Sequence, residues 1–317
     1  MGHRRVTGAG RLPLAALALA MIAIGAPAHG QQGSGWQMTP NELPANTTVV
    51  PRSTVEPKAP ASATGELALI AFLTDDGQRI DQGVVWRVFQ EQSANPDARP
   101  KLVTTSRDQS PVLRLAPGDY IVNAAFGRAH LTRKVKIDAA AKMQERFVLN
   151  AGGLRVTAQL ATGEAAPDRS ITYEILSGEA DQLGNRTRIM GGGRPGVVVR
   201  LNSGIYQIVS TYGDANAVVR ADVTVEAGKL TEATVKHTGA KVTFKLVTQA
   251  GGEAQADTQW TLVNNSGDLV KDSVGALPTH ILAPGSYVVT AKLRGRSFRR
   301  NFTVSAGETT QIEVVMQ

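Results

Sequence analysis

Residues 115–127 read LAPGDYIVNAAFG, and the pattern returns as LNSGIYQIVSTYG at 201–213 and as LAPGSYVVTAKLRG at 282–295. Each copy has a leucine, a short turn that contains a glycine, and a tyrosine that begins an alternating strand. The turn glycines are 86 and 81 residues apart: Gly118, Gly204 and Gly285. Self-similarity at a nearly fixed period is the mark of a repeat architecture. The sequence therefore predicts three tandem copies of one unit.

A second landmark lies upstream of each turn, in GVVWRVF, SITYEIL and DTQWTLV. The central aromatics are 87 and 87 residues apart: Trp86, Tyr173 and Trp260. In the first copy Val84, Trp86 and Val88 alternate with other residues, and Arg87 falls on the opposite face. Apolar residues at every second position, with the other face exposed to solvent, are typical of an antiparallel sheet in a sandwich. No stretch shows sustained helical periodicity. The predicted fold class is all-β, with three tandem immunoglobulin-like antiparallel β-sandwiches.

The N-terminal segment reads as an export signal. Arg4, Arg5 and Arg11 precede the apolar run LPLAALALAMIAIGA, and small residues follow. This layout is typical of a secretory signal peptide. Cleavage falls after Ala28 or after Gly30; the alternative is an uncleaved membrane anchor, for which the run is short. An alanine-rich signal and the absence of cysteine favour a soluble periplasmic or secreted protein of a Gram-negative bacterium, with no transmembrane segment after cleavage.

The predicted domain organisation has five parts. Residues 1–30 are the signal peptide, and 31–64 form a disordered linker rich in Pro, Ser and Thr. The sandwiches are expected at 65–151, 152–239 and 240–317. Trp36 stands alone in the linker, where it is either exposed or docked on the first sandwich. Two stretches inside the sandwiches are predicted to be loops, 138–147 (a loop or one helical turn) and 190–196.

The repeated aromatics have a structural interpretation. In immunoglobulin-like sandwiches a tyrosine at this corner hydrogen-bonds back to nearby backbone and locks the turn between sheets. This role is predicted for Tyr120, Tyr206 and Tyr287. The other three, Trp86, Tyr173 and Trp260, are predicted to anchor the cores.

The order of an opening strand, an aromatic-centred strand, L-x-P-G-x-Y and a closing V-x-A-G turn resembles bacterial carboxypeptidase-regulatory-like modules, which are transthyretin-like and immunoglobulin-like β-sandwiches. The resemblance covers residues 65–317 three times over. It implies an accessory module of secreted and envelope proteins rather than a catalytic unit. The second copy departs from the pattern, since Asn202-Ser203 replaces Ala-Pro, which should weaken its turn.

No catalytic or cofactor motif is present in the sequence. H-E-x-x-H, G-x-S-x-G and a Walker lysine motif are all missing, and the five histidines are scattered and expected at the surface. Asp75-Asp76-Gly77 with Asp81 is expected to be a solvated turn rather than a calcium site. We therefore expect no enzyme, cofactor or metal.

The strongest local charge is a basic cluster in the third copy, made of Arg294, Arg296, Arg299 and Arg300. It is either the solvent-exposed face of a strand or a binding patch for an anionic partner such as a lipid headgroup or polymer phosphate. Basic residues are not interleaved with aromatics, so no nucleic-acid partner is expected.

The sequence thus predicts a non-enzymatic, exported interaction or scaffold protein of the cell envelope, with an envelope protein or glycan as partner. The alternative is a periplasmic protein that binds carbohydrate or peptidoglycan through exposed aromatics. The spare aromatics for such a platform are Phe126, Tyr212 and Phe298.

Overall fold

The computed structural model describes residues 63–92, 99–167 and 169–317. The predicted signal peptide, Trp36 and nearly all of the predicted linker lie outside these ranges. Within them the chain forms strands and no helix. It follows that no described helix is long and apolar enough to cross a membrane.

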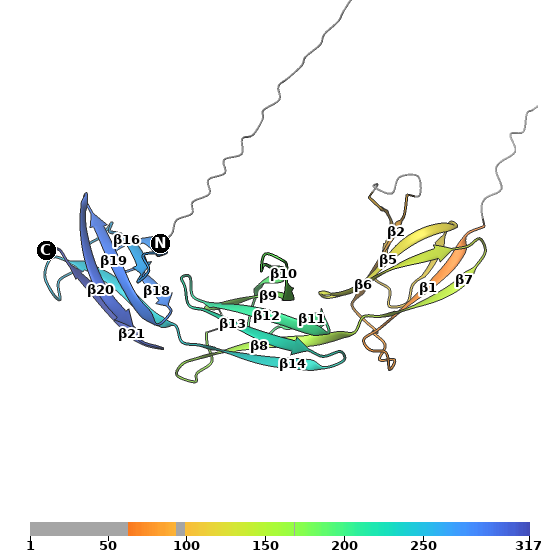
Figure 1. The fold of residues 1–317 in the computed structure, drawn as a ribbon, viewed down its shortest axis with the longest axis horizontal. Helices are drawn as coiled ribbons and strands as arrows, with labels where there is room; N and C mark the ends of the chain where they lie inside the picture. The colour runs from red at the N-terminus through yellow and green to blue at the C-terminus, as the bar shows by residue number, and fades with distance from the viewer. Residues whose placement is uncertain (1–62, 93–98, 168) are drawn as a thin grey trace, which may run out of the picture. The chain divides into compact units, whose positions relative to one another are not determined.

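The strands form three groups of seven, which we call modules 1, 2 and 3 (Figure 1). Module 1 contains β1 (Gly65–Phe72), β2 (Val84–Gln90), β3 (Lys101–Ser106), β4 (Val112–Leu115), β5 (Gly118–Phe126), β6 (Ala129–Ile137) and β7 (Lys142–Val148). Module 2 contains β8 (Ala151–Leu160), β9 (Ile171–Ala180), β10 (Arg186–Gly193), β11 (Val198–Asn202), β12 (Gly204–Tyr212), β13 (Val218–Val225) and β14 (Leu230–His237). Module 3 contains β15 (Ala240–Val247), β16 (Gln259–Asn264), β17 (Leu269–Val274), β18 (Thr279–Leu282), β19 (Gly285–Leu293), β20 (Arg296–Val304) and β21 (Thr309–Val315).

Each module is a sandwich of a three-stranded and a four-stranded sheet. In module 1 the sheet orders are β4-β1-β7 and β3-β2-β5-β6, and the other modules repeat both orders. The predicted all-β, three-sandwich fold is thus confirmed. One ladder per module is parallel, between the first and last strands. Nearly the whole module separates these two strands in sequence, so the long connection that a parallel pair requires is available.

The core of each module lies between its two sheets. In module 1, Leu67 and Leu69 of β1 are fully buried with Trp86 and Val88 of β2. The Trp86 ring meets the ring of Phe147 edge-on, with centroids 5.3 Å apart. Each fully buried large apolar side chain stabilises the fold by about 1.5–3 kcal/mol. The period-two pattern thus decides which residues form the core.

The three turn glycines have nearly the same backbone conformation. Their φ angles are 153° at Gly118, 152° at Gly204 and 155° at Gly285, a region that L side chains rarely adopt. The Asn202-Ser203 departure therefore leaves the shape of the module 2 turn unchanged.

Both stretches predicted to be loops are partly strands. Residues 142–147 lie in β7, because the alternating pattern resumes after a short alanine-rich turn. Residues 190–193 lie in β10, which pairs with β9 through several register shifts. A side chain at Gly193 would lie 2.6 Å from the ring of Tyr173, so the glycine lets an aromatic core residue pack directly under the strand.

Candidate functional sites at the module junctions

The predicted anchor aromatics lie inside the module cores, where Trp86, Tyr173 and Trp260 are at most 2% exposed. The indole N–H of Trp86 donates to the carbonyl of Asp108 at 3.1 Å, and that of Trp260 to the carbonyl of Gly275 at 2.8 Å. The Tyr173 hydroxyl is buried without a hydrogen-bond partner in the described part of the chain. Burial raises the pKa of this hydroxyl.

The corner tyrosines all bond to the carbonyl oxygen four residues earlier. The donor–acceptor distances are 2.8 Å for Tyr120, 2.9 Å for Tyr206 and 2.7 Å for Tyr287. Tyr120 and Tyr287 are buried, whereas Tyr206 is half-buried. Burial raises the pKa of both Tyr120 and Tyr206.

The four arginines of the predicted basic patch in module 3 do not all lie in the same element. Arg294 lies in the turn before β20, and the other three, Arg296, Arg299 and Arg300, lie in β20. The guanidinium of Arg300 donates to the backbone carbonyl of Glu313 in β21 and so bridges the two sheets. The Arg296 guanidinium lies over the Phe298 ring, 5.1 Å from its centroid. The Arg299 guanidinium donates to the Thr290 hydroxyl at 3.4 Å. Three of the four cations therefore already have contacts within their own module.

Junction 1, between modules 1 and 2, is built on Asn202. Its side-chain amide donates to the carbonyl of Leu149 at 2.7 Å and to the carbonyl of His130 at 3.2 Å. Its side-chain oxygen accepts from the backbone N–H of His130 at 3.1 Å. Beside it, the N–H of Arg128 donates to the carbonyl of Arg200 at 2.9 Å. The residue that breaks the repeated motif thus carries polar contacts between the modules.

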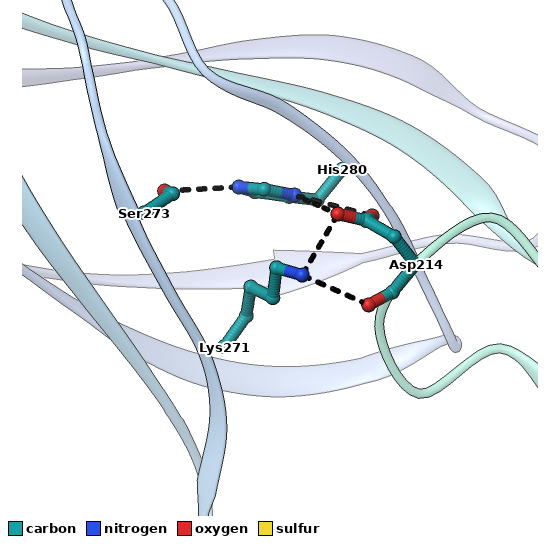
Figure 2. A network of polar contacts seen from close by, with 4 residues as sticks. All are labelled: Asp214, Lys271, Ser273 and His280. Atoms are coloured by element: carbon teal, nitrogen blue, oxygen red, sulfur yellow. Dashed lines mark hydrogen bonds and ion pairs between the residues drawn. The ribbon is translucent and has the colours of Figure 1, made fainter.

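Junction 2, between modules 2 and 3, is built on Asp214 in the turn between β12 and β13. Figure 2 shows its carboxylate between Lys271 and His280. The Lys271 ammonium lies 2.9 Å from one carboxylate oxygen, and Nδ1 of His280 lies 3.2 Å from both. Burial raises the pKa of Asp214, but the bonds from Lys271 and His280 outweigh burial and leave it lowered.

A second residue of the same turn extends junction 2. The Asn216 amide donates to the Tyr287 hydroxyl at 2.9 Å, and its oxygen accepts from the N–H of Ala283 at 3.1 Å. The corner tyrosine of module 3 therefore takes part in both its own turn and the junction.

Ser273 completes the network of Figure 2. Its hydroxyl lies 3.0 Å from Nε2 of His280, so Ser273, His280 and Asp214 have the order of contacts of a Ser–His–Asp triad. A nucleophilic triad also needs hydrogen-bond donors aimed at the oxyanion that develops during the reaction. In this network the Asp214 carboxylate is shared between His280 and Lys271. The His280 side chain is only 7% exposed. The geometry therefore suits a junction contact better than a nucleophile.

Both junctions share one plan, in which the hairpin after the fifth strand of one module meets the fourth strand of the next. The hairpin glycines are Gly127 and Gly213. A Cβ added to Gly127 would lie 2.9 Å from the Cβ of Arg200, and one added to Gly213 would lie 2.6 Å from that of Ile281. The absence of a side chain at these positions allows the modules to approach closely.

Two histidines predicted at the surface are buried, His237 and His280. Nε2 of His237 lies 2.9 Å from the Ser210 hydroxyl, and burial lowers the pKa of its imidazole. The expectation was wrong because single histidines on short strands carry no sign of the neighbouring module. The position of His237 at the end of β14, next to the join between modules 2 and 3, was the available signal for that residue, whereas His280 lies in β18, far from the join in sequence.

The aromatics considered for a glycan platform are largely covered. Phe126 and Phe298 are 9% and 5% exposed, and the Tyr212 ring packs against His237 at 5.8 Å. Arg79 pairs with Asp81 at 3.7 Å in the turn considered for calcium. In the described ranges no group of three His, Cys, Asp or Glu residues is arranged to hold a metal ion.

Comparison with known proteins gives one family match and several distant structural likenesses. The model described as "Rhizobiales growth-associated tandem repeat domain" matches residues 241–316, which lie in module 3. No curated protein sequence matches the chain.

Among solved structures, a streptococcal ancillary pilin is 11% identical, with 80% of this chain and 100% of that one covered and a TM-score of 0.28. The minor pilin GBS52 of Streptococcus agalactiae is 13% identical, with 55% and 95% covered and a TM-score of 0.31. The Bacillus anthracis TIE protein is 18% identical, with 80% and 51% covered and a TM-score of 0.23, so this chain spans about half its length. Module 3 is thus similar to a described tandem repeat, and the fold is established by the chain's own sheets.

Proposed function

We propose that the protein is a non-enzymatic, exported scaffold of the cell envelope whose linked modules present binding surfaces to an envelope partner. The observation that carries this proposal is that polar residues which do not follow the repeat form hydrogen bonds and ion pairs between the modules. Asn202 at junction 1 and Asp214 at junction 2 each bond to the neighbouring module. Such contacts suit a protein whose work depends on the order and spacing of its modules.

Export is supported by the N-terminal sequence, with its arginines, apolar run and small residues. We propose removal of residues 1–30, a tether at 31–64, and a periplasmic or secreted location in a Gram-negative bacterium. The match of module 3 to a repeat described as growth-associated supports a role in the growing envelope.

We further propose that the modules are relatives of carboxypeptidase-regulatory-like sandwiches, with boundaries at 65–151, 152–239 and 240–317. The L-x-P-G-x-Y corner and the V-x-A-G turn support this relationship. The basic patch of Arg294, Arg296, Arg299 and Arg300 stays a proposal for an anionic partner. Binding of carbohydrate or peptidoglycan remains the alternative. It would have to rely mainly on polar groups, because Phe126 and Phe298 are buried and Tyr212 is half-buried.

Cell fractionation of the tagged full-length protein tests export. We expect a shortened chain in the periplasm or medium; a full-length chain held in the cytoplasm would overturn the location. The scaffold role is tested by crosslinking and recovery from envelope extracts, with Asn202→Asp/Asp214→Asn as the variant that loosens both junctions. We expect this variant to recover less of the partner while each module stays folded. Equal recovery would show that module arrangement is irrelevant.

The absence of activity is tested at the Ser273 network, which among the described residues has the contacts of a Ser–His–Asp triad. We expect no hydrolysis of p-nitrophenyl acetate above the buffer rate. Hydrolysis that Ser273→Ala abolishes would make the protein a hydrolase.

A further inference from the structure

A cleft of about 590 Å³ lies beside junction 1 and is lined by residues of both modules. Its polar and charged lining consists of three arginines, one asparagine and one histidine: Arg87, Arg128, Arg188, Asn123 and His130. The rest of the lining is aliphatic, from Val85, Ala125 and Ile189, and contains no Phe, Tyr or Trp ring.

Module 1 supplies most of the charge. Arg87 of β2 and Asn123 of β5 are register partners on the outer face of the four-stranded sheet, with Nη1 and Oδ1 3.5 Å apart. Arg128 lies in the turn between β5 and β6, held by its backbone bond to Arg200. Neither Arg87 nor Arg128 forms an ion pair within residues 63–92, 99–167 and 169–317. Neither guanidinium is therefore neutralised by a described carboxylate, and Arg87 is also oriented by its contact with Asn123.

Module 2 closes the cleft with Arg188 of β10, whose guanidinium lies 3.3 Å from the carboxylate of Glu174. This one carboxylate offsets one of three arginines, so the cleft keeps a net positive charge. The position of Arg188 depends on the register shifts of β10, one of which falls between Arg186 and Arg188. The irregular strand β10 thus places the Arg188 guanidinium of module 2 beside the cleft residues of module 1.

The arginine–asparagine pair is not part of the repeat. In module 3 the residues that face each other at the matching register are Thr261 and Thr290. In module 2 they are Glu174 and Val209. Since the fold forms without this pair in two of its three copies, the pair is not explained by folding.

We propose that this cleft binds the oxyanion of an acidic saccharide, a carboxylate or phosphate carried on a sugar chain. The planar fork of a guanidinium matches both groups through paired, charge-assisted hydrogen bonds. The Asn123 amide already bonds to Arg87 through its oxygen and to the Thr132 hydroxyl, at 2.9 Å, through its nitrogen. Because an amide has two N–H groups and two lone pairs, it has one further donor and one further acceptor for sugar hydroxyls. A single-stranded nucleic acid would need aromatic platforms for its bases, which this lining does not offer. The site goes beyond the scaffold role, because it requires neither export nor a protein partner.

Calorimetric titration of the purified protein tests the site, with oligogalacturonate as the carboxylate probe, a sugar phosphate as the phosphate probe and neutral dextran as the control. The variant is Arg87→Gln/Arg128→Gln. The matched control is Arg294→Gln/Arg299→Gln, which removes the same charge from module 3. We expect an acidic probe to bind and dextran not to bind. The cleft variant should bind about tenfold more weakly or worse, as expected for lost bonds to charged groups. The control should be unchanged, and added salt should weaken binding.

The two acidic probes separate the carboxylate from the phosphate source, and tighter binding by either supports the site. If both double variants lose the same affinity for the acidic probe, binding depends on overall charge and not on the cleft. If only the module 3 variant loses affinity, the probe binds at the predicted basic patch instead of the cleft. Tighter binding of poly-glutamate or single-stranded DNA than of any saccharide would overturn the ligand class. Absence of binding by both acidic probes would overturn the site. Unchanged melting of the variants confirms that they are folded.

Discussion

The side-chain amide of Asn202 donates to the carbonyl oxygen of Leu149 at 2.7 Å, across the boundary between two modules. Asn202 stands where the other copies have alanine, so the bond is possible only in module 2. At junction 2 the polar contacts come from the hairpin side, from Asp214 in a turn that is longer than the β5–β6 and β19–β20 turns. Departures from the repeat therefore mark the places where the copies touch.

Replacing Asn202 by alanine should destabilise modules 1 and 2 by about 1–3 kcal/mol, because three contacts are lost and two carbonyls and one N–H lose a partner. Urea unfolding measures the free energy, and hydrogen exchange should show faster exchange at the His130 amide. Ser203→Ala is the matched control, since the bond of Ser203 to Asn150 uses only its backbone N–H. An equal effect of both substitutions would contradict the role of Asn202.

Tyr287→Phe should cost more stability than Tyr120→Phe. Each change removes one hydroxyl bond to a carbonyl, about 0.5–1.5 kcal/mol, but only Tyr287 also accepts from Asn216 across junction 2. Denaturant unfolding of both variants gives the comparison. In an Asn216→Ala background the two costs should become similar, and a difference that persists would show that Asn216 is not its source.

Asp214 should make junction 2 sensitive to acid. Its pKa is lower in the folded protein than in the unfolded chain, so its contribution is present above the unfolded value of about 4 and is lost as pH falls through the folded pKa. Because the carboxylate is 53% exposed, we expect about 1 kcal/mol or less at neutral pH.

Asp214→Asn tests this dependence when the stability of both proteins is followed by unfolding across acidic pH. The wild-type advantage should shrink as pH falls and vanish in strong acid. If the difference in stability between the wild type and Asp214→Asn stays constant with pH, the shape of the Asp214 side chain and not its charge stabilises junction 2.

Tyr173→Phe should leave module 2 as stable as the wild type, or more stable by about 1 kcal/mol. The hydroxyl is buried without a described partner, and a buried polar group without a hydrogen bond costs free energy. Thermal melting measures the change, with Tyr206→Phe as the contrast because that hydroxyl is bonded and its loss should destabilise. Marked destabilisation by Tyr173→Phe would mean that the hydroxyl has a partner such as bound water.

The parallel ladder between β1 and β7 is the part of the fold that the sequence did not reveal. Alternation in LALIAF shows which side chains face inward, but it is the same for a parallel and an antiparallel neighbour. The positions of Trp86 and Tyr120, in contrast, followed from the spacing of their copies.

The repeated pattern was enough to predict the number of modules, the core aromatics and the glycine corners, because burial on one face of a strand and positive φ at a turn are local requirements that each copy repeats. The junctions and the basic cleft became visible only in the folded chain. Asp214 and His280 are 66 residues apart, and Arg87 and Arg188 come from different modules. Such pairs depend on how folded modules meet, and a local pattern carries no trace of the surface that another module will present.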